Sequence, residues 1–232
     1  MPKFFKTQMI LLSFILLTFS ANAQTISKTD TYVKIETNKG NLFFQLFDET
    51  PIHKKSFVKL AKQRFFNAYD FNRVIKGFVI QGGETDSAYA VMNKDPKKLV
   101  SYLLPEFKTN LFHQRGALAA GRDDNKEKKS FTGQFYVVDG KKYSDVQLDA
   151  IEKRIGIDFK FADSARKIYK EIGGTPHLDQ NYTVFGHLVK GWDVLDKIAS
   201  AHKDKADKPL SRISIKVSIL NKLEIKKLLS SI

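Results

Sequence analysis

The stretch FNRVIKGFVIQGG, residues 71–83, carries two polar side chains inside runs that otherwise have the apolar character of β-strands. One is Arg73, and a buried guanidinium is costly unless another group pairs with it. Arg73 therefore either points to solvent or presents its charge at an apolar surface, where it would be a donor that never loses its proton. The other is Gln81, which shares a strand face with Val79 because strand side chains alternate with a period of two.

Other kinds of catalytic site have little support in the sequence. The five histidines (His53, His113, His177, His187 and His202) show neither HxH nor HExxH spacing, so we expect no metal and no cofactor. The chain has no cysteine and no GxSxG segment, and nothing in the sequence places an acid and a base together. A hydrolase with a serine or histidine centre is therefore only a formal alternative.

Short apolar runs separated by glycine predict many strands. Residues 32–37 and 41–47 form a hairpin around a turn, and Thr50 and Pro51 indicate the N-cap and first residue of a helix. Further strands are expected at residues 71–75, 78–81, 116–119, 135–138, 184–188 and 213–220, with a second helix at residues 192–199. Because strands and helices do not alternate regularly, the pattern favours a mainly β fold, a closed antiparallel β-barrel capped by two helices.

Residues 141–174 break this rhythm and indicate a helical insertion. Ser144 and Gln147 form a capping box, and a second helix starts at Asp163. We favour packing of both helices on the barrel, since amphipathic helices usually bury their apolar stripe on their own domain; the alternative is a surface for a client or partner protein. The Lys/Leu-rich end after Asn221 is expected to be a loosely held tail.

The first 23 residues have the features of a signal peptide. Lys3 and Lys6 give a basic start, residues 9–19 are almost entirely apolar, and Ala21-Asn22-Ala23 has the spacing of a cleavage site. The apolar run is short for a membrane anchor, which needs about 20 residues. We therefore expect an exported protein, periplasmic or secreted, whose mature chain is one domain over residues 24–232 without a membrane span.

The formal net charge is +14, which raises the question of nucleic-acid binding. The lysines are spread through loops, at residues 97–98, 126–129 and 141–142, and are not set between stacking aromatic residues. We therefore expect no nucleic-acid partner. The charge favours instead a weak attraction to acidic chains or surfaces.

Two further motifs join the opening stretch, the first in two parts before the insertion and the second after it. GALAAGR, residues 116–122, precedes GQFYVV, residues 133–138, and TPHLDQNYTVFG, residues 175–186, follows the insertion. In this order the motifs resemble the cyclophilin family of peptidyl-prolyl cis-trans isomerases, from about residue 33 to residue 220. The agreement of three separated motifs makes the resemblance specific. It implies an eight-stranded antiparallel barrel closed by two helices. Together with the signal peptide, it indicates an exported bacterial member of the family.

The resemblance assigns site residues on the outer face of the barrel. Arg73 matches the catalytic arginine of the family and Gln81 the glutamine that orients it, so Arg73 is expected to face a half-buried outer groove. Matches to substrate-binding positions are Phe78, Val79, Tyr136, His177 and Leu178 around the proline ring, Gln134 in the groove, Tyr182 at the rim, and Gly121 and Arg122 where backbone groups pair with the residues before proline.

The implied substrate is an extended or unfolded proline-containing polypeptide. Rotation about an X-Pro bond is opposed by a barrier of about 18–20 kcal/mol. In the twisted state the prolyl nitrogen regains its lone pair, so a donor such as Arg73 is attracted more strongly there than in either planar form. The leading hypothesis is an isomerase that assists the folding of exported proteins. The alternative is a chaperone or proline-binding module without useful catalysis, which would not need Arg73 and Gln81.

Two departures from the family pattern matter. Asn72 stands where many relatives have histidine, so an imidazole cannot act there, although a hydrogen-bonding role can survive. His177 replaces a tryptophan that is common in members that bind cyclosporin strongly. We therefore expect weak cyclosporin binding with isomerase activity retained.

Overall fold

The computed structural model describes residues 31–92 and 101–232. The expected signal peptide lies outside the described residues. Within these two ranges, no helix combines the length and the apolar character that crossing a bilayer requires. In the same ranges, no three acidic or histidine side chains gather in a way that could hold a metal ion.

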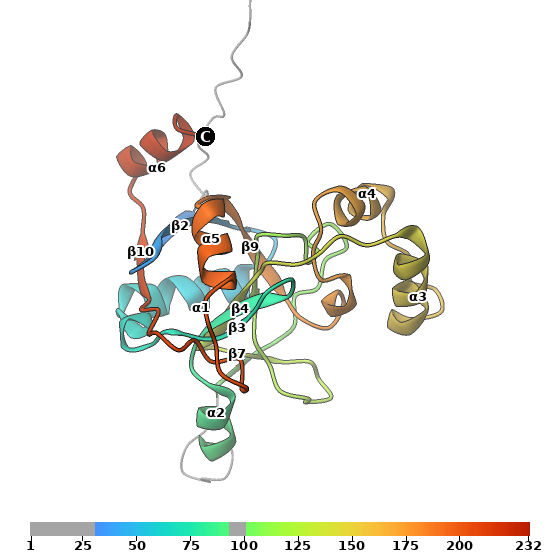
Figure 1. Ribbon diagram of the computed structural model, residues 1–232, viewed down its shortest axis with the longest axis horizontal. Helices are drawn as coiled ribbons and strands as arrows, with labels where there is room; N and C mark the ends of the chain where they lie inside the picture. Colours follow the sequence, from blue (N-terminus) through green and yellow to red (C-terminus); the bar gives the residue numbers. More distant parts are fainter. Residues whose placement is uncertain (1–30, 93–100) are drawn as a thin grey trace, which may run out of the picture.

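Eight antiparallel strands form the main sheet (Figure 1). They are β1 (Thr31–Thr37), β2 (Gly40–Leu46), β3 (Phe71–Ile75), β4 (Val79–Gly83), β6 (Ala117–Ala120), β8 (Gln134–Val138), β9 (Val184–Lys190) and β10 (Lys216–Ile219). Their order across the sheet is β10-β1-β2-β9-β6-β8-β4-β3. A small separate ladder joins β5 (Tyr102–Leu103) to β7 (Ser130–Phe131). The predicted hairpin is confirmed as β1 and β2.

The sheet is open between its two edges, β3 and β10, so the expected barrel closure is incomplete. Next to the edges, Asp70 and Ser214 form an isolated bridge. The strand predicted at residues 213–220 is regular only over β10. The loop before it contains Pro209, which cannot donate to a strand ladder. This loop contacts β3 at separate points instead, and Val74 N donates to Asp207 O at 2.8 Å.

The sheet buries apolar side chains on both faces. The larger core lies on the inner face and includes Val33, Ile35, Phe44, Ile80, Leu118, Phe135 and Val137. It is covered by α1 (Pro51–Lys62) and α5 (Trp192–Ala199), the two capping helices that the sequence predicts. Phe57 of α1 and Phe66 of the short helix η1 (Phe65–Ala68) pack their rings 4.9 Å apart in this core. A smaller cluster on the outer face comprises Val79, Ala117, Ala119, Tyr136, Val138 and Val184.

Helix α1 starts at Pro51 as predicted, but Thr50 does not cap it, since its side chain forms no cap hydrogen bond. The Glu106 carboxylate accepts instead from the backbone N–H groups of Ile52 and His53, both at 3.0 Å. A carboxylate at this position also interacts favourably with the helix dipole. A residue far away in the sequence therefore caps the helix.

The helical insertion lies between β8 and β9. It contains α3 (Asp145–Ile155) and α4 (Asp163–Glu171), and the predicted capping box of Ser144 and Gln147 is confirmed. The two helices share a small core formed by Leu148, Ile151, Phe161, Ala165 and Tyr169, with Phe112 packed against it. Figure 1 shows the pair beside the sheet, and not over one of its faces. The helices therefore bury their apolar stripes partly on each other and partly on the body of the domain, where the ring centroids of Phe112 and Tyr169 lie 5.3 Å apart.

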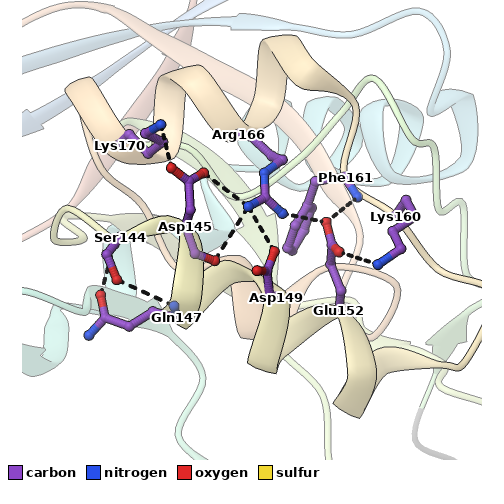
Figure 2. A network of polar contacts seen from close by, with 9 residues as sticks. All are labelled: Ser144, Asp145, Gln147, Asp149, Glu152, Lys160, Phe161, Arg166 and Lys170. Atoms are coloured by element: carbon purple, nitrogen blue, oxygen red, sulfur yellow. Dashed lines mark hydrogen bonds and ion pairs between the residues drawn. The ribbon is translucent and has the colours of Figure 1, made fainter.

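A set of ion pairs fastens α3 to α4 (Figure 2). Glu152 is 2% exposed and accepts from Lys160 Nζ at 2.8 Å, Arg166 Nη1 at 2.9 Å and Phe161 N at 3.0 Å. Arg166 also pairs with Asp149 at 2.8 Å. Burial raises the pKa of Glu152, but its hydrogen bonds outweigh burial and hold the pKa below the usual value. The carboxylate therefore stays charged and joins the two helices.

The C-terminal segment is a packed helix, so the prediction of a loose tail is wrong. Helix α6 (Lys222–Leu229) is capped by the side chain of Asn221. Ile225 and Leu228 lie three positions apart on one face and are buried with Tyr32 and Leu220. Because the Lys/Leu pattern is amphipathic, it gave the signal for this helix.

Candidate active site

Strand register places Arg73, Gln81, Tyr136 and Ala119 in one row across β3, β4, β8 and β6. Residues that are directly opposite each other on neighbouring strands point to the same face. Ala119 and Tyr136 belong to the outer apolar cluster, so the row lies on the outer face. Arg73 is half-buried there, at an apolar surface and away from the inner core.

A cavity of 140 Å³ opens at this row. Its wall is formed by Arg73, Phe78, Val79, Gln81, Asp86, Gly121, Arg122, Gln134, Tyr136, Leu178 and Tyr182. Every site residue that the sequence predicts lines this cavity except His177. Asp86, at the first position of α2 (Asp86–Met92), is a wall residue that the sequence analysis did not name.

Arg73 and Gln81 are direct neighbours across the β3–β4 pair. Gln81 is 8% exposed, so its amide lies deep in the cavity wall. In the described ranges, neither side chain has a hydrogen bond or ion pair to another residue. The strand register places Gln81 opposite the guanidinium, but the expected hydrogen bond between them is not formed. The Arg73 donors are therefore free to bind a ligand.

The apolar part of the cavity comes from Phe78, Val79, Tyr136 and Leu178. His177 lies behind this wall: its ring stacks on Phe78 at 5.5 Å and it lines a neighbouring cavity. His177 and the next residue, Leu178, line different cavities because the short helix η2 (Pro176–Leu178) points successive side chains in different directions. Desolvation lowers the pKa of His177, and the nearby charges of His113 and Arg154 lower it further.

Gly121 and Arg122 lie just beyond the end of β6. Both backbone groups of Gly121 are already bonded, since its N–H donates to Gln134 O at 3.1 Å and its carbonyl accepts from Phe131 N at 2.8 Å. The Arg122 backbone has no hydrogen bond to any described residue. Of the two predicted backbone partners for a peptide, Arg122 is therefore the available one.

The Arg122 side chain fixes the rim of the cavity. Nη2 donates to Asn181 Oδ1 at 2.6 Å, Nε donates to Asn181 O at 2.8 Å, and the guanidinium carbon lies 5.1 Å from the centre of the Tyr182 ring. Burial raises the pKa of Tyr182, so its hydroxyl stays protonated at neutral pH. Arg122 and Tyr182 form a positioned edge instead of a mobile, solvated loop.

Gln134 and Asn72 organise the turn at the other end of β4. Gln134 is 4% exposed and donates through Nε2 to Asp86 Oδ1 at 2.7 Å and Glu84 O at 2.9 Å. Asn72 Nδ2 donates to Gly83 O at 2.7 Å, so its side chain forms a hydrogen bond within the β3–β4 hairpin. A side chain at Gly121 would collide with Gln134, because a Cβ there would lie 1.9 Å from Gln134 Oε1.

A buried chain of hydrogen bonds connects the pocket to the insertion. Tyr136 OH lies 2.9 Å from His113 Nε2, His113 Nδ1 lies 2.6 Å from Asp179 Oδ1, and Tyr169 OH donates to Asp179 Oδ2 at 2.6 Å. Asp179 also accepts from His113 N at 2.9 Å. Burial raises the pKa of Tyr136 and Tyr169 well above the usual tyrosine value, so both hydroxyls remain donors. Tyr169 of α4 thus supports the orientation of a pocket residue.

A second buried row has the order of a serine–histidine–acid triad. His53 Nδ1 lies 2.7 Å from Glu106 Oε2, and His53 Nε2 lies 3.1 Å from Ser130 Oγ. Burial lowers the pKa of His53, opposed by the Glu106 carboxylate. Ser130 is 0% exposed, so no substrate can reach its hydroxyl. The row holds the start of α1 in place and does not support a hydrolase.

Comparison with known proteins agrees with this architecture. Residues 32–219 match the model of the family described as cyclophilin type peptidyl-prolyl cis-trans isomerase/CLD. The chain belongs to the cyclophilin-type peptidyl-prolyl cis-trans isomerase family.

Relatives and solved structures are consistent with this family. A Staphylococcus saprophyticus protein that has been assigned the name peptidyl-prolyl cis-trans isomerase is 33% identical over 189 residues, covering 78% of this chain and 87% of its own. A Staphylococcus haemolyticus protein assigned the same name is 32% identical, covering 82% and 91%. A cyclophilin-type isomerase from Cryptosporidium parvum covers 83% of this chain and 99% of its own at 24% identity and a TM-score of 0.59. The same protein in the presence of the dipeptide Ala-Pro gives a TM-score of 0.58. These structures share the mainly β cyclophilin fold.

Proposed function

We propose that the cavity around Arg73 binds an extended polypeptide at a proline, and that Arg73 accelerates rotation of the preceding peptide bond. The observation that carries the proposal is the placing of Arg73. It is half-buried, it lines the same cavity as the apolar side chains, and it has no hydrogen bond or ion pair to another described residue. A cation that is partly removed from water and left unpaired is costly, so its position favours a ligand that accepts its hydrogen bonds.

The chemistry follows from what changes during rotation. No covalent bond is broken, but the prolyl nitrogen becomes pyramidal and regains its lone pair as the amide twists. A donor at this nitrogen stabilises the twisted state more than either planar state, and only such a difference accelerates the reaction. A guanidinium serves well because it stays protonated, and partial exclusion of water strengthens its effect.

Rotation also requires that one side of the bond is held while the other turns. Phe78, Val79, Tyr136 and Leu178 supply an apolar slot for the pyrrolidine ring. The unpaired backbone groups of Arg122 can bind the residues before proline as a strand would. Gln81, directly opposite Arg73, can bond the guanidinium once a peptide fills the cavity.

The mechanism is tested by isomerisation kinetics of a proline peptide with the mature protein, Arg73→Ala and Arg73→Lys. Loss of one preorganised donor costs about 10²–10³ in rate, so we expect Arg73→Ala to lose about this factor in kcat/KM. Arg73→Lys should recover only part, because an ammonium lacks the planar fork. Lys76→Ala, an exposed cation in the turn after β3, is the matched control. Equal rates for Arg73→Ala and Lys76→Ala would refute the role of Arg73, and retained peptide binding without catalysis in the unaltered protein would favour the binding-module alternative.

We also propose that the enzyme acts on exported proteins, in the periplasm or outside the cell. This rests on the basic start, the apolar run and the Ala21-Asn22-Ala23 site at the beginning of the sequence. Expression of the whole chain in a bacterium, followed by fractionation and N-terminal sequencing, should give an exported protein that begins at Gln24. An uncleaved chain in the cytoplasm would contradict it.

A further inference from the structure

A second cavity of 360 Å³ lies beside the proline cavity. It is lined by Lys128, Ile151, Arg154, Ile155, His177, Asp179, Gln180 and Asn181. Helix α3 of the insertion supplies Ile151, Arg154 and Ile155 to its wall, and residues 177 and 179–181, in and just after η2, supply another part. It is the larger of the two cavities and owes one of its sides to the insertion.

The two cavities adjoin. Leu178 lines the proline cavity and the next residue, Asp179, lines the second. His177 lines the second cavity while its ring stacks on Phe78, a wall residue of the first. Because an extended chain advances about 3.3 Å per residue, a peptide that leaves the proline slot past Phe78 reaches the second cavity within a few residues.

The charge of the second cavity is positive. Arg154 is exposed and has no ion pair or hydrogen bond to a described residue. Lys128 Nζ donates to Gln180 O at 2.8 Å, which leaves two of its three hydrogens for another acceptor. Asp179 does not offset these charges at the surface, because it is 5% exposed and its oxygens accept from His113 and Tyr169.

The backbone around this cavity is held in an unusual conformation. Lys128 at φ 53° and Gln180 at φ 59° are two of the four non-glycine residues with positive φ in the described ranges. This region is sparsely populated by residues with side chains, and such strain concentrates where a ligand is bound. The hydrogen bond from Lys128 to Gln180 joins the two strained positions across the cavity rim.

We propose that this second cavity binds an acidic side chain of the substrate, on the side of the proline that leaves the slot past Phe78 and His177. The carboxylate pairs with Arg154, whose planar fork suits a carboxylate, and with the free hydrogens of Lys128. The inference rests on the proposed function and adds a substrate class to it: polypeptides with Asp or Glu within a few residues of the proline.

The experiment uses one proline peptide in which Glu, Gln or Lys replaces each of the three residues on either side of the proline, one position at a time. Isomerisation is measured by NMR exchange, which needs no coupling protease with preferences of its own. At about 50 mM salt we expect Glu to raise kcat/KM about two- to fivefold over Gln, the range of a solvent-exposed ion pair. The gain is expected at one or more peptide positions on the side of the proline that runs past Phe78. The gain should shrink at about 500 mM salt, where screening is strong.

Variants separate this cavity from the general charge of the protein. Arg154→Ala should abolish the preference for Glu over Gln. Lys153→Ala, the neighbouring exposed cation, lies outside the cavity and should keep the preference. The inference is overturned if no position prefers Glu, or if the two variants reduce the preference equally.

Failure of the proposed function would be seen differently, as no acceleration for any peptide. Titration of the Glu and Gln peptides by calorimetry then decides the question of the cavity. Tighter binding of the Glu peptide that depends on Arg154 would support the assignment of the cavity, and equal binding would overturn it.

Discussion

Replacing Asp179 by alanine should reveal how much the pocket depends on the buried chain of hydrogen bonds. The carboxylate accepts three bonds in the interior, from His113 N, His113 Nδ1 and Tyr169 OH, at 2.9, 2.6 and 2.6 Å. The alanine leaves all three donors without their acceptor. A buried donor that loses its partner costs about 1–3 kcal/mol. Asp179 lines the second cavity, so water can reach part of the vacated space. We therefore expect a total loss of about 3–5 kcal/mol.

The free energy of unfolding is measured by urea titration at neutral pH, followed by the fluorescence of Trp192, the one tryptophan of the chain. Asp179→Asn should cost much less, because its amide oxygen can accept from His113 and its NH₂ can donate to the Tyr169 hydroxyl. Asp158→Ala, at an exposed aspartate, should lie within about 0.5 kcal/mol of the parent.

The same variants test the support of Tyr136. When His113 loses Asp179, the ring that bonds Tyr136 OH is no longer oriented, so KM for proline peptides should rise more than kcat falls. A loss below about 1 kcal/mol for Asp179→Ala, with unchanged KM, would refute the reasoning, since it would mean that the three bonds contribute neither stability nor pocket geometry.

Three further predictions concern other parts of the chain. Cyclosporin should inhibit the protein only weakly, and a titration with tight binding would contradict this. The lowered pKa of Glu152 contributes stability that is complete above the usual glutamate value of 4.5 and is lost as the pH falls through the lower folded value. Thermal unfolding from pH 7 down to about pH 3 should therefore show a steeper acid loss for the parent than for Glu152→Gln, and parallel profiles would argue against it. Ile225→Ala should cost about 2–4 kcal/mol in urea titration, whereas a loss near zero would mean that α6 does not pack.

The relative positions of site residues that are close together in the sequence can be predicted, because the pairing of neighbouring strands relates them by a simple register. Arg73 and Gln81 belong to one hairpin, and the alternation of their strands fixes the shared face. Helix α5 and the capping box of α3 follow from local patterns in the same way. Apolar periodicity and caps are properties of a few neighbouring residues, so a single sequence displays them.

Contacts between distant polar residues could not be predicted. His113 and Asp179 are 66 residues apart and His53 and Glu106 are 53 apart, and no local pattern relates them. The same holds for the cap of α1, where Thr50 has the preferred residue type but Glu106 does the capping. The place of His177 depends on the turn of η2, which the residue types alone did not define. Helix α6 differs from these cases, because its amphipathic pattern is visible in the sequence and argues against the loose tail expected there.

The insertion leaves and rejoins the body at adjacent points. Lys141 N donates to Gly174 O at 3.1 Å and Gly174 N donates to Lys141 O at 3.0 Å, so the segment is closed at its base. A change in the length of α3 would not need to displace β8, β9 or Arg73. On the proposed function, variation in α3 would therefore reshape one wall of the second cavity, while Tyr169 of α4 keeps its hydrogen bond to Asp179 and the cavity around Arg73 stays in place.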